Sequence, residues 1–250
     1  MDPARLAVVV CDMWDATHCV QAQARAGSLA PRIDALLRAL RGRGALVIHA
    51  PADCMPFYEG TEARRRAREA PFAAAPRAFA WNWWEDDERA ALPASLTDPG
   101  GCSCDAPAPC GDGSAPAPWT RQTPRIHVDD ARDAVTDDGQ ETWNLLAERG
   151  IADVALVGVH ANVCVLSRWY GIRQLVYGGL RPVLCGDLTD AFHRDPRGHA
   201  WGNAALLAHV ARRWCPVVTG DALLRRLDGA SAHARRAGGS TDQVVSHEDA

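Results

Sequence analysis

The stretch DVALVGVHANVCVLSRWYG, residues 153–171, decides the fold of this chain. It opens with the near-continuous apolar run 153–159, which is typical of a strand buried inside a parallel sheet. Cys164 follows a few residues later, where the first turn of a helix is expected. Two roles are open for its thiol: a small buried residue of the core, or a nucleophile at the end of a strand.

The alternation of strand and helix continues on both sides of this stretch. Apolar runs predict further strands at 5–12, 45–50, 181–187 and 215–220. Helical spacing of apolar residues predicts helices at 29–44, 139–150, 162–179 and 200–214. Strands that alternate with helices over short loops form a mostly parallel sheet covered on both faces. The predicted fold class is therefore α/β, a Rossmann-like three-layer sandwich.

One long segment, residues 51–124, interrupts this regular pattern. It contains a short charged helix near 61–70, a tryptophan cluster at 81–84 and a segment rich in Pro, Gly and Cys. Irregular stretches of this length inside a compact domain are unusual and often functional. We expect an insertion that folds onto a single domain of residues 1–228. The polar, apolar-poor residues 229–250 are expected to form a disordered tail.

Composition narrows the class of protein. The chain has 250 residues, 47% of them hydrophobic, and a net charge of −4, which fits one large domain. No clustered basic stripe suggests nucleic acid, and no apolar run reaches the ~18 residues of a membrane helix. The N-terminal apolar run is too short for a signal peptide. We expect a cytoplasmic protein, in which nine cysteines argue against a disulfide framework and for reduced thiols, metal ligands or catalysis.

Polar residues follow the predicted strands where a parallel sheet binds its ligands. Asp12 follows the first strand, His49 and Asp53 lie at the end of the second, and His160 and Cys164 follow the run 153–159. A cysteine in the first turn of a helix is expected to have a lowered pKa. An aspartate nearby can take the thiol proton, and backbone N–H groups can hold an oxyanion.

Three segments carry a resemblance to a known family. AVVVCDMWD at 7–15, ALVIHAPADCM at 45–55 and NLLAERGIADVALVGVHANVCVLSR at 144–168 are similar to the isochorismatase-like cysteine hydrolases. The resemblance covers the core and leaves out the insertion. It implies hydrolysis of a small amide, ureido or related C–N substrate (or vinyl ether), through a Cys164 thioester in the amide case. It also implies a homo-oligomer that needs no cofactor.

The resemblance assigns roles to particular residues. Asp12 would be the general base and acid, and Val159–His160 would be a cis peptide bond. The N–H groups of His160 and Cys164 would form the oxyanion hole.

One departure from the family pattern concerns its lysine. The family uses Asp, Lys and Cys, but all 27 basic residues of this chain are arginine. The lysine should fall near Asp129 or Asp130, where the charge is inverted. We therefore consider Arg121, Arg125 and His127 as replacements. An arginine can stabilise charge but cannot shuttle a proton.

Two functional classes follow from the missing lysine. With a replacement the chain is a hydrolase; without one it is an altered or inactive member that binds a small molecule or a protein. The chain also resembles an uncharacterised branch of the family in DMWDATHC and GIRQ, which places the missing lysine in a subgroup. A third possibility is thiol redox chemistry that pairs Cys164 with a cysteine of the insertion.

Other polar clusters leave alternatives open. Cys102, Cys104 and Cys110 can ligate zinc with a fourth ligand such as Cys54 or His127, can remain free or redox-active thiols, or can form disulfides. Asp12, Asp15, His18 and Cys19 lie close in sequence, with His49 and Asp53 one strand over. They can hold a metal, or cap turns and form hydrogen bonds through the histidines. The residues predicted to line a substrate pocket are Trp14, His49, Asp53 and Trp83. The tryptophans of 81–84 can instead pack the insertion down or bury a subunit contact.

Overall fold

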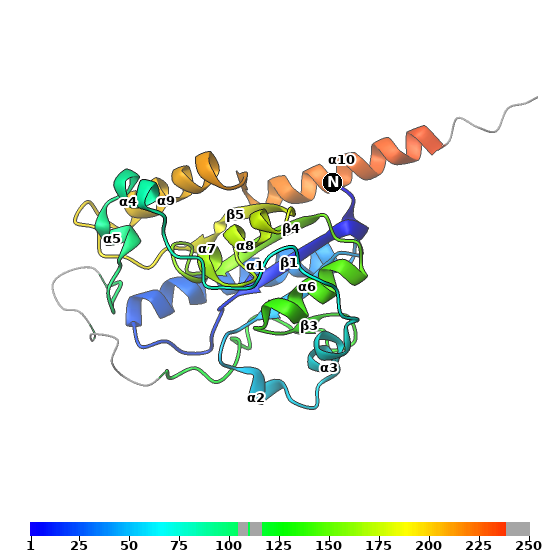
Figure 1. Ribbon diagram of the computed structural model, residues 1–250, viewed down its shortest axis with the longest axis horizontal. Coiled ribbons are helices and arrows are strands. Elements are labelled where there is room, and N and C mark those ends of the chain that lie inside the picture. Colours follow the sequence, from blue (N-terminus) through cyan, green and yellow to red (C-terminus); the bar gives the residue numbers. More distant parts are fainter. Residues whose placement is uncertain (105–109, 111–116, 239–250) are drawn as a thin grey trace, which may run out of the picture.

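A parallel sheet forms the centre of the protein (Figure 1). The computed structural model describes residues 1–104, 110 and 117–238. Among these residues the sheet has six strands, all parallel, in the order β3-β2-β1-β4-β5-β6. The strands are β1 (Leu6–Cys11), β2 (Leu46–Ala50), β3 (Ala134–Val135), β4 (Asp153–Val159), β5 (Arg181–Asp190) and β6 (Val217–Val218). The predicted α/β sandwich is confirmed.

Helices cover both faces of the sheet because the central strands β1 and β4 are apolar along nearly their whole length, so both faces need burial. Leu6, Val8 and Val10 of β1 pack with α1 (Val20–Arg41) and α10 (Gly220–Gly238). Ala7 and Val9 point to the other face. That face is covered by α3 (Glu62–Glu69), α6 (Gly139–Glu148), α7 (Cys164–Ser167), α8 (Ile172–Tyr177) and α9 (His199–Arg213).

Two predicted helices differ from the observed ones. Helix α1 begins at Val20, well before the predicted start, because the small buried residues Ala22 and Ala26 extend its inner face. The single helix predicted over 162–179 is split into α7 and α8. Gly171 is the N-cap of α8, and a Cβ there would lie 2.8 Å from the carbonyl oxygen of Val165. This sharp turn therefore requires a glycine.

The described part of the insertion contacts the core of the domain. Besides α3 it contains α2 (Met55–Tyr58), α4 (Asp86–Ala91) and α5 (Ala94–Thr97). Glu88 of α4 pairs with Arg173 of α8 at 2.9 Å, and both side chains are fully buried. His209 of α9 meets the same carboxylate at 2.9 Å. Removing one partner from such a buried ion pair typically costs about 3–5 kcal/mol, so this contact anchors the insertion.

The C-terminal segment differs from the expected tail. Helix α10 continues to Gly238, so part of the segment predicted to be disordered is helical. In Figure 1 the helix extends away from the body of the domain. Residues 239–250 of the predicted tail lie outside the described residues.

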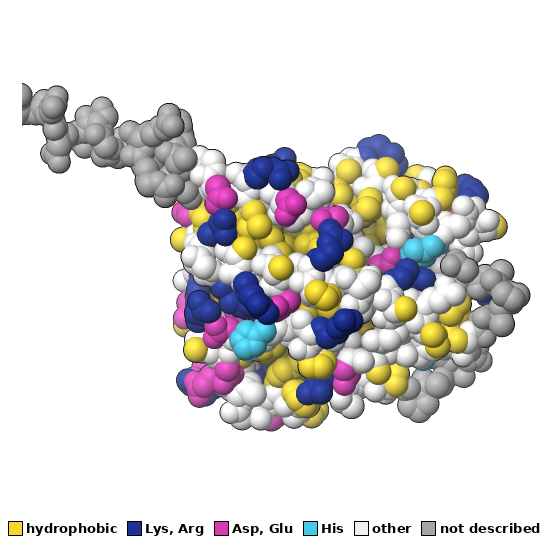
Figure 2. Space-filling view, turned by 180° about the vertical axis from the view of Figure 1, so that it is seen from behind, with side chains coloured by type: hydrophobic (Ala, Val, Ile, Leu, Met, Phe, Trp, Pro, Cys, Tyr) yellow, Lys and Arg dark blue, Asp and Glu magenta, His cyan; other side chains and the backbone are white. Residues whose placement is uncertain are grey.

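The surface carries both signs of charge. On the face shown in Figure 2, arginine and acidic side chains are interspersed, and neither sign forms a stripe. Among the helices described, none is long and apolar enough to cross a membrane.

Candidate active site

The candidate site lies where the order of the strands reverses. From β1 the chain passes to β2 on one side, whereas β4 lies against β1 on the other side. Cys11 is in register with Gly158, so Asp12 and the residues after β4 leave the sheet side by side. A Cβ on Gly158 would lie 2.1 Å from the carbonyl oxygen of Cys11, and its φ is 101°. Only glycine permits this close approach.

The carboxyl group of Asp12 is fully buried at this point. Its backbone adopts φ 46°, a left-handed conformation that aspartate tolerates better than most residues. Oδ1 accepts a hydrogen bond of 2.8 Å from the N–H of Ala52. Oδ2 accepts none from the described residues and lies 3.6 Å from Nε of Arg168. Burial raises the pKa of Asp12, and the charge of Arg168 partly offsets that rise. Oδ2 is thus free to accept a proton.

Cys164 is the first residue of α7, and only 5% of it is exposed. Burial raises the pKa of its thiol well above the ordinary value, and the charge of Asp12 raises it further. Arg168 acts in the opposite direction. The lowered pKa expected for this cysteine is therefore wrong. Helix α7 has only four residues, so its dipole is small compared with the cost of a buried thiolate.

The positive charge of the site comes from Arg168. This residue caps the C-terminus of α7 one turn after Cys164, and its guanidinium lies 5.3 Å from the ring of Trp81 and 5.5 Å from that of Trp169. The two rings hold the cation beside Asp12. Arg168 is not among the predicted replacements, because the family has its lysine in another segment of the chain. The spacing of four residues from Cys164 was the available signal.

The residues predicted to replace the lysine lie elsewhere. The guanidinium of Arg125 donates to the carbonyl oxygen of Gly27 at 2.9 Å. The backbone of His127 binds Asp34, and Arg121 faces Asp15.

The two aspartates at the position expected for the lysine point to other partners. Asp129 pairs with Arg132, and the carboxylate of Asp130 accepts a hydrogen bond from the N–H of Ala63. None of the residues 129–138 is among those that line the Cys164 pocket.

Cys164 opens into a pocket of about 320 Å³. The pocket is largely aromatic: Trp14 stacks on Trp119 with ring centroids 4.3 Å apart, and Phe192 meets the ring of His160 edge-on at 4.9 Å. Burial lowers the pKa of His160 to about 4, so its imidazole is neutral at pH 7. The remaining lining residues are Thr17, His18, Pro99, Gly100, Gly101, Val163 and Cys164. The pocket thus suits a small, flat, neutral group.

Of the predicted pocket residues, Trp14 lines the pocket and three others do not. His49 is buried between Asp133 and Gln122, with hydrogen bonds of 3.0 Å to each. The N–H of Asp53 binds the carboxylate of Asp137. Trp83 is 71% exposed because its neighbours Trp81 and Trp84 supply the packing.

The backbone before Cys164 contains the cis peptide bond that the resemblance implies. The peptide bond between Val159 and His160 is cis. The carbonyl oxygen of His160 accepts hydrogen bonds from the N–H groups of Val163 and Val165. Cys164 lies between these two residues at the start of α7, where a backbone N–H has no acceptor within its own helix.

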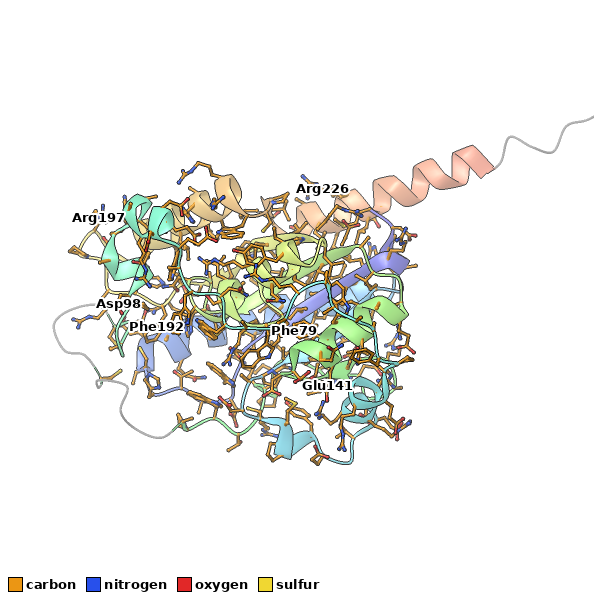
Figure 3. All side chains as sticks on the ribbon, in the orientation of Figure 1. Phe79, Asp98, Glu141, Phe192, Arg197 and Arg226 are labelled. Carbon is orange, nitrogen blue, oxygen red and sulfur yellow. The ribbon has the colours of Figure 1, made fainter. Side chains whose placement is uncertain are left out.

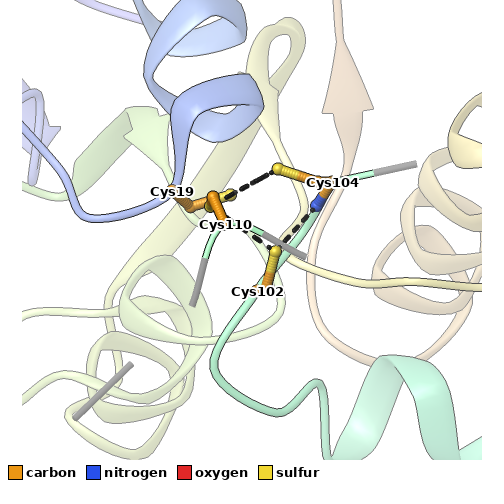
Figure 4. Close-up of side chains that lie close together, drawn as sticks. All are labelled: Cys19, Cys102, Cys104 and Cys110. Atoms are coloured by element: carbon orange, nitrogen blue, oxygen red, sulfur yellow. Dashed lines mark hydrogen bonds between the residues drawn. The ribbon is translucent and has the colours of Figure 1, made fainter. Parts of the chain in front are cut away.

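A second group of sulfur atoms lies beside the pocket. Cys102, Cys104 and Cys110 meet Cys19, and their four sulfurs lie within 4.8 Å of one another (Figure 4). Among the described residues, this is the one group of metal-ligating side chains close enough to share an ion. Neither Cys54 nor His127 belongs to it, and neither do Asp12, Asp15 and His18. Cys19 directly precedes α1 and is far in sequence from the other three cysteines.

Comparison with known proteins supports the fold. No protein-family model matches the chain, and no curated protein matches it. A cysteine hydrolase from Pseudomonas syringae pv. phaseolicola 1448A is 17% identical, with a TM-score of 0.57 over 92% of this chain and 95% of that one. An isochorismatase family protein from Burkholderia thailandensis is 16% identical, with a TM-score of 0.54 over 91% and 97%.

A third solved structure agrees with these two. An isochorismatase family protein from Desulfovibrio vulgaris subsp. vulgaris is 15% identical, with a TM-score of 0.50 over 91% of this chain and 98% of that one. The chain therefore has the fold of the isochorismatase-like cysteine hydrolases. The predicted resemblance is confirmed at the level of the fold.

Proposed function

We propose that the protein is a cysteine hydrolase that cleaves a C–N bond of a small amide or ureido compound through a Cys164 thioester. The observation that carries this proposal is the Arg168 guanidinium, whose Nε lies 3.6 Å from the Asp12 carboxylate. It supplies a positive charge where the chain has no lysine. Without such a charge, a buried carboxylate beside a thiol would favour neither thiolate formation nor an anionic intermediate.

In the first half of the reaction, Oδ2 of Asp12 takes the proton of the Cys164 thiol as the sulfur attacks the substrate carbonyl. The thiol is protonated in the free enzyme because burial raises its pKa, so proton transfer and attack are coupled. The carbonyl oxygen becomes an oxyanion, held by the backbone N–H groups that the resemblance assigns to this task. The C–N bond then breaks, Asp12 gives its proton to the departing nitrogen, and a thioester remains.

In the second half, water replaces the amine. Asp12 is again ionised and takes a proton from the water, which attacks the thioester carbonyl. The C–S bond breaks, and the proton returns to the Cys164 sulfur as the acid product leaves. Arg168 keeps its proton throughout, because a guanidinium is not deprotonated in proteins. Its role is to stabilise the ionised Asp12 and the negative charge that builds up around the sulfur.

The pocket restricts the substrate. Stacked rings of Trp14 and Trp119 favour a flat group, and the Nε2 atom of the neutral His160 has no partner among the described residues. That nitrogen can donate or accept a hydrogen bond, according to the tautomer of the ring, and so can bind a polar substituent of the substrate. Compounds with a planar ring or conjugated amide are therefore the first to test.

The test is a screen of small amides and ureido compounds for ammonia release, with intact-mass analysis of quenched samples. Wild-type protein should release ammonia from a subset of them and show an acyl adduct on Cys164. Cys164→Ala should do neither, whereas Cys215→Ala, which changes a buried thiol elsewhere in the core, should behave like wild type. Equal release by wild type and Cys164→Ala from every compound would contradict the proposal.

The chain is also proposed to act as a homo-oligomer in a reducing compartment such as the cytoplasm. All nine cysteines are free thiols. Phe72 and Trp83 of the insertion are 76% and 71% exposed, and their burial in a contact between subunits would be favourable. Light scattering on a size-exclusion column should give a mass above that of one chain. A monomer at all concentrations would contradict self-association.

The cysteine cluster has a separate role in the proposal. No step of the hydrolysis passes through it, and the reaction requires no cofactor. Four sulfur ligands favour zinc over the hard cations that prefer oxygen, so a structural zinc ion is the ligand proposed for it.

A further inference from the structure

The four sulfurs of the cysteine cluster have the spacing of a metal site rather than of disulfides. The distances are 3.6 Å for Cys19–Cys104, 3.7 Å for Cys102–Cys110 and 3.5 Å for Cys104–Cys110 (Figure 4). A disulfide bond is about 2.05 Å long. With zinc–sulfur bonds of about 2.3 Å, a tetrahedral site has sulfur–sulfur edges of about 3.8 Å. The observed distances are close to these edges.

Groups around the cluster favour thiolates. The N–H of Ser103 donates to the sulfur of Cys19 at 3.3 Å, and the N–H of Cys104 donates to that of Cys102 at 3.4 Å. Such donors stabilise negative charge on ligand atoms and fix their direction. The guanidinium of Arg25 binds the carbonyl oxygen of Ser103 at 3.0 Å, and that of Arg194 binds the carbonyl oxygen of Cys104 at 3.1 Å. Arg194 therefore places a cation near the site, whereas the charge of Arg25 is balanced by Asp190 at 2.9 Å.

The cluster joins two segments that line the Cys164 pocket, which we call its two walls. Thr17 and His18 form one of them and are followed directly by Cys19. Pro99, Gly100 and Gly101 form the other and are followed directly by Cys102. The sulfur of Cys110 also contacts the carbonyl oxygen of His18 at 3.4 Å.

Two apolar residues connect the cluster with the pocket interior. Phe192 packs with the buried cysteines of the cluster, and Val163 packs against the same group; both also line the pocket. Figure 3 labels Phe192 and, near it, Asp98, which precedes the wall at 99–101. A change in the cluster would therefore be transmitted to the surface that faces Cys164.

We infer that Cys19, Cys102, Cys104 and Cys110 bind one zinc ion as thiolates and that this ion holds the two walls of the substrate pocket together. Each thiol that binds releases its proton to solvent, so four thiols and Zn²⁺ give a tetrathiolate of charge −2 and four protons. No electron is transferred. The metal site stands on its own geometry, whereas its effect on the pocket rests on the proposed hydrolase function.

The first experiment measures the metal. The full chain is expressed with zinc, dialysed and analysed for metal content, and the chelated protein is then titrated with Co²⁺. Wild type and Cys215→Ala should carry one zinc ion per chain and give the intense visible bands of tetrahedral cobalt with a thiolate charge-transfer band. Cys104→Ser should lose the charge-transfer intensity and most of the zinc. Cys110→Ser tests the same point at an exposed residue, where folding is not at risk.

Two outcomes would overturn the metal site. One is wild-type protein that binds neither zinc nor cobalt while it remains folded by circular dichroism. The other is protein purified without reductant in which mass spectrometry finds disulfides among these cysteines and no metal.

The second experiment measures the pocket wall. The alkylation rate of Cys164 is followed with a small and a bulky reagent before and after zinc removal, by mass spectrometry of the Cys164 peptide. Loss of zinc should increase the rate of alkylation by the bulky reagent several-fold more than the rate of alkylation by the small one. If zinc is bound but its removal changes neither alkylation rate, the ion does not hold the pocket walls together. The proposed function fails separately, if zinc is bound and the wall responds but no C–N substrate is turned over.

Discussion

Cys164 lines the pocket and the cysteine cluster lies next to residues that line it, and the two differ in what positions them. Cys164 lies at the ends of β1 and β4, two neighbouring strands of the core, beside Asp12 and Arg168. The cysteine cluster is assembled from the segment before α1 and the insertion. The register of the sheet fixes the first site, whereas folding of the insertion onto the domain forms the second.

The comparison also concerns charge. A single thiol faces a buried carboxylate, and its pKa is raised, so it reacts only when Asp12 can take its proton. Four thiols that lie together would repel one another as thiolates, and a bound cation removes that cost. Under the two proposals the same side chain acts as a nucleophile in one place and as a ligand in the other, according to the charges around it.

The largest effect is expected at the nucleophile. Cys164→Ala should lower turnover by at least about 10³-fold, because the covalent path is lost. The zinc content should not change, because the cluster does not use this residue. Ammonia-release assays and metal analysis on the same sample measure both. Loss of zinc together with turnover would show that the two sites are not independent.

The next effect tests the arginine. Arg168→Gln should lower kcat/KM by about 100-fold, equivalent to about 3 kcal/mol, because Asp12 and the developing negative charge lose their cation. Arg168→Lys should retain more activity. The matched control is Arg121→Gln, since Arg121 pairs with Asp15 instead of Asp12. Equal losses in Arg168→Gln and Arg121→Gln would remove Arg168 from the mechanism.

A third substitution disturbs the close approach of β1 and β4, which positions Asp12 and Cys164, and leaves the cysteine cluster unchanged. Gly158→Ala should lower the free energy of unfolding by more than about 2 kcal/mol, a factor of about 30 in the folding equilibrium, because its Cβ would meet the Cys11 carbonyl. Gly179→Ala is the control. Gly179 also has a positive φ, of 80°, but a Cβ there meets nothing within 4 Å. It should cost about 1 kcal/mol. Urea unfolding compares the two, and similar losses would show that close approach at Gly158 is unimportant.

The smallest effect is a shift in pH dependence. The pKa of Asp12 is raised by burial, so the acidic limb of kcat/KM should lie above the ordinary aspartate value of about 3.9. Activity falls below that limb because a protonated Asp12 cannot accept the thiol proton. Arg168→Gln should move the limb to higher pH, since the guanidinium lowers this pKa; Arg168→Lys, which keeps a charge, should move it less. If the acidic limb lies at the ordinary aspartate pKa in wild type, Arg168→Gln and Arg168→Lys alike, Asp12 is not the base.

Much of the fold and part of the site were predictable from the sequence. Apolar runs that alternate with helical patterns specified a parallel sheet with two covered faces. The carboxyl ends of neighbouring parallel strands share an edge, so the sequence could also place Asp12 near Cys164. The resemblance marked the cis bond at Val159–His160. These features are local, or follow from strand order, and so are encoded in short segments.

The remaining features depend on contacts between distant segments. Cys19 meets Cys104 across 85 positions of sequence, so no local spacing could name it as the fourth ligand. The guanidinium of Arg168 lies beside Asp12 because Trp81, from the insertion, packs against it. Burial, which sets the direction of the pKa shifts of Cys164 and Asp12, exists only in the folded chain. The sequence by itself determined the strand ends and their chemical groups; the tertiary structure decided which charges meet there, because electrostatic interactions depend on distance and on exclusion of water.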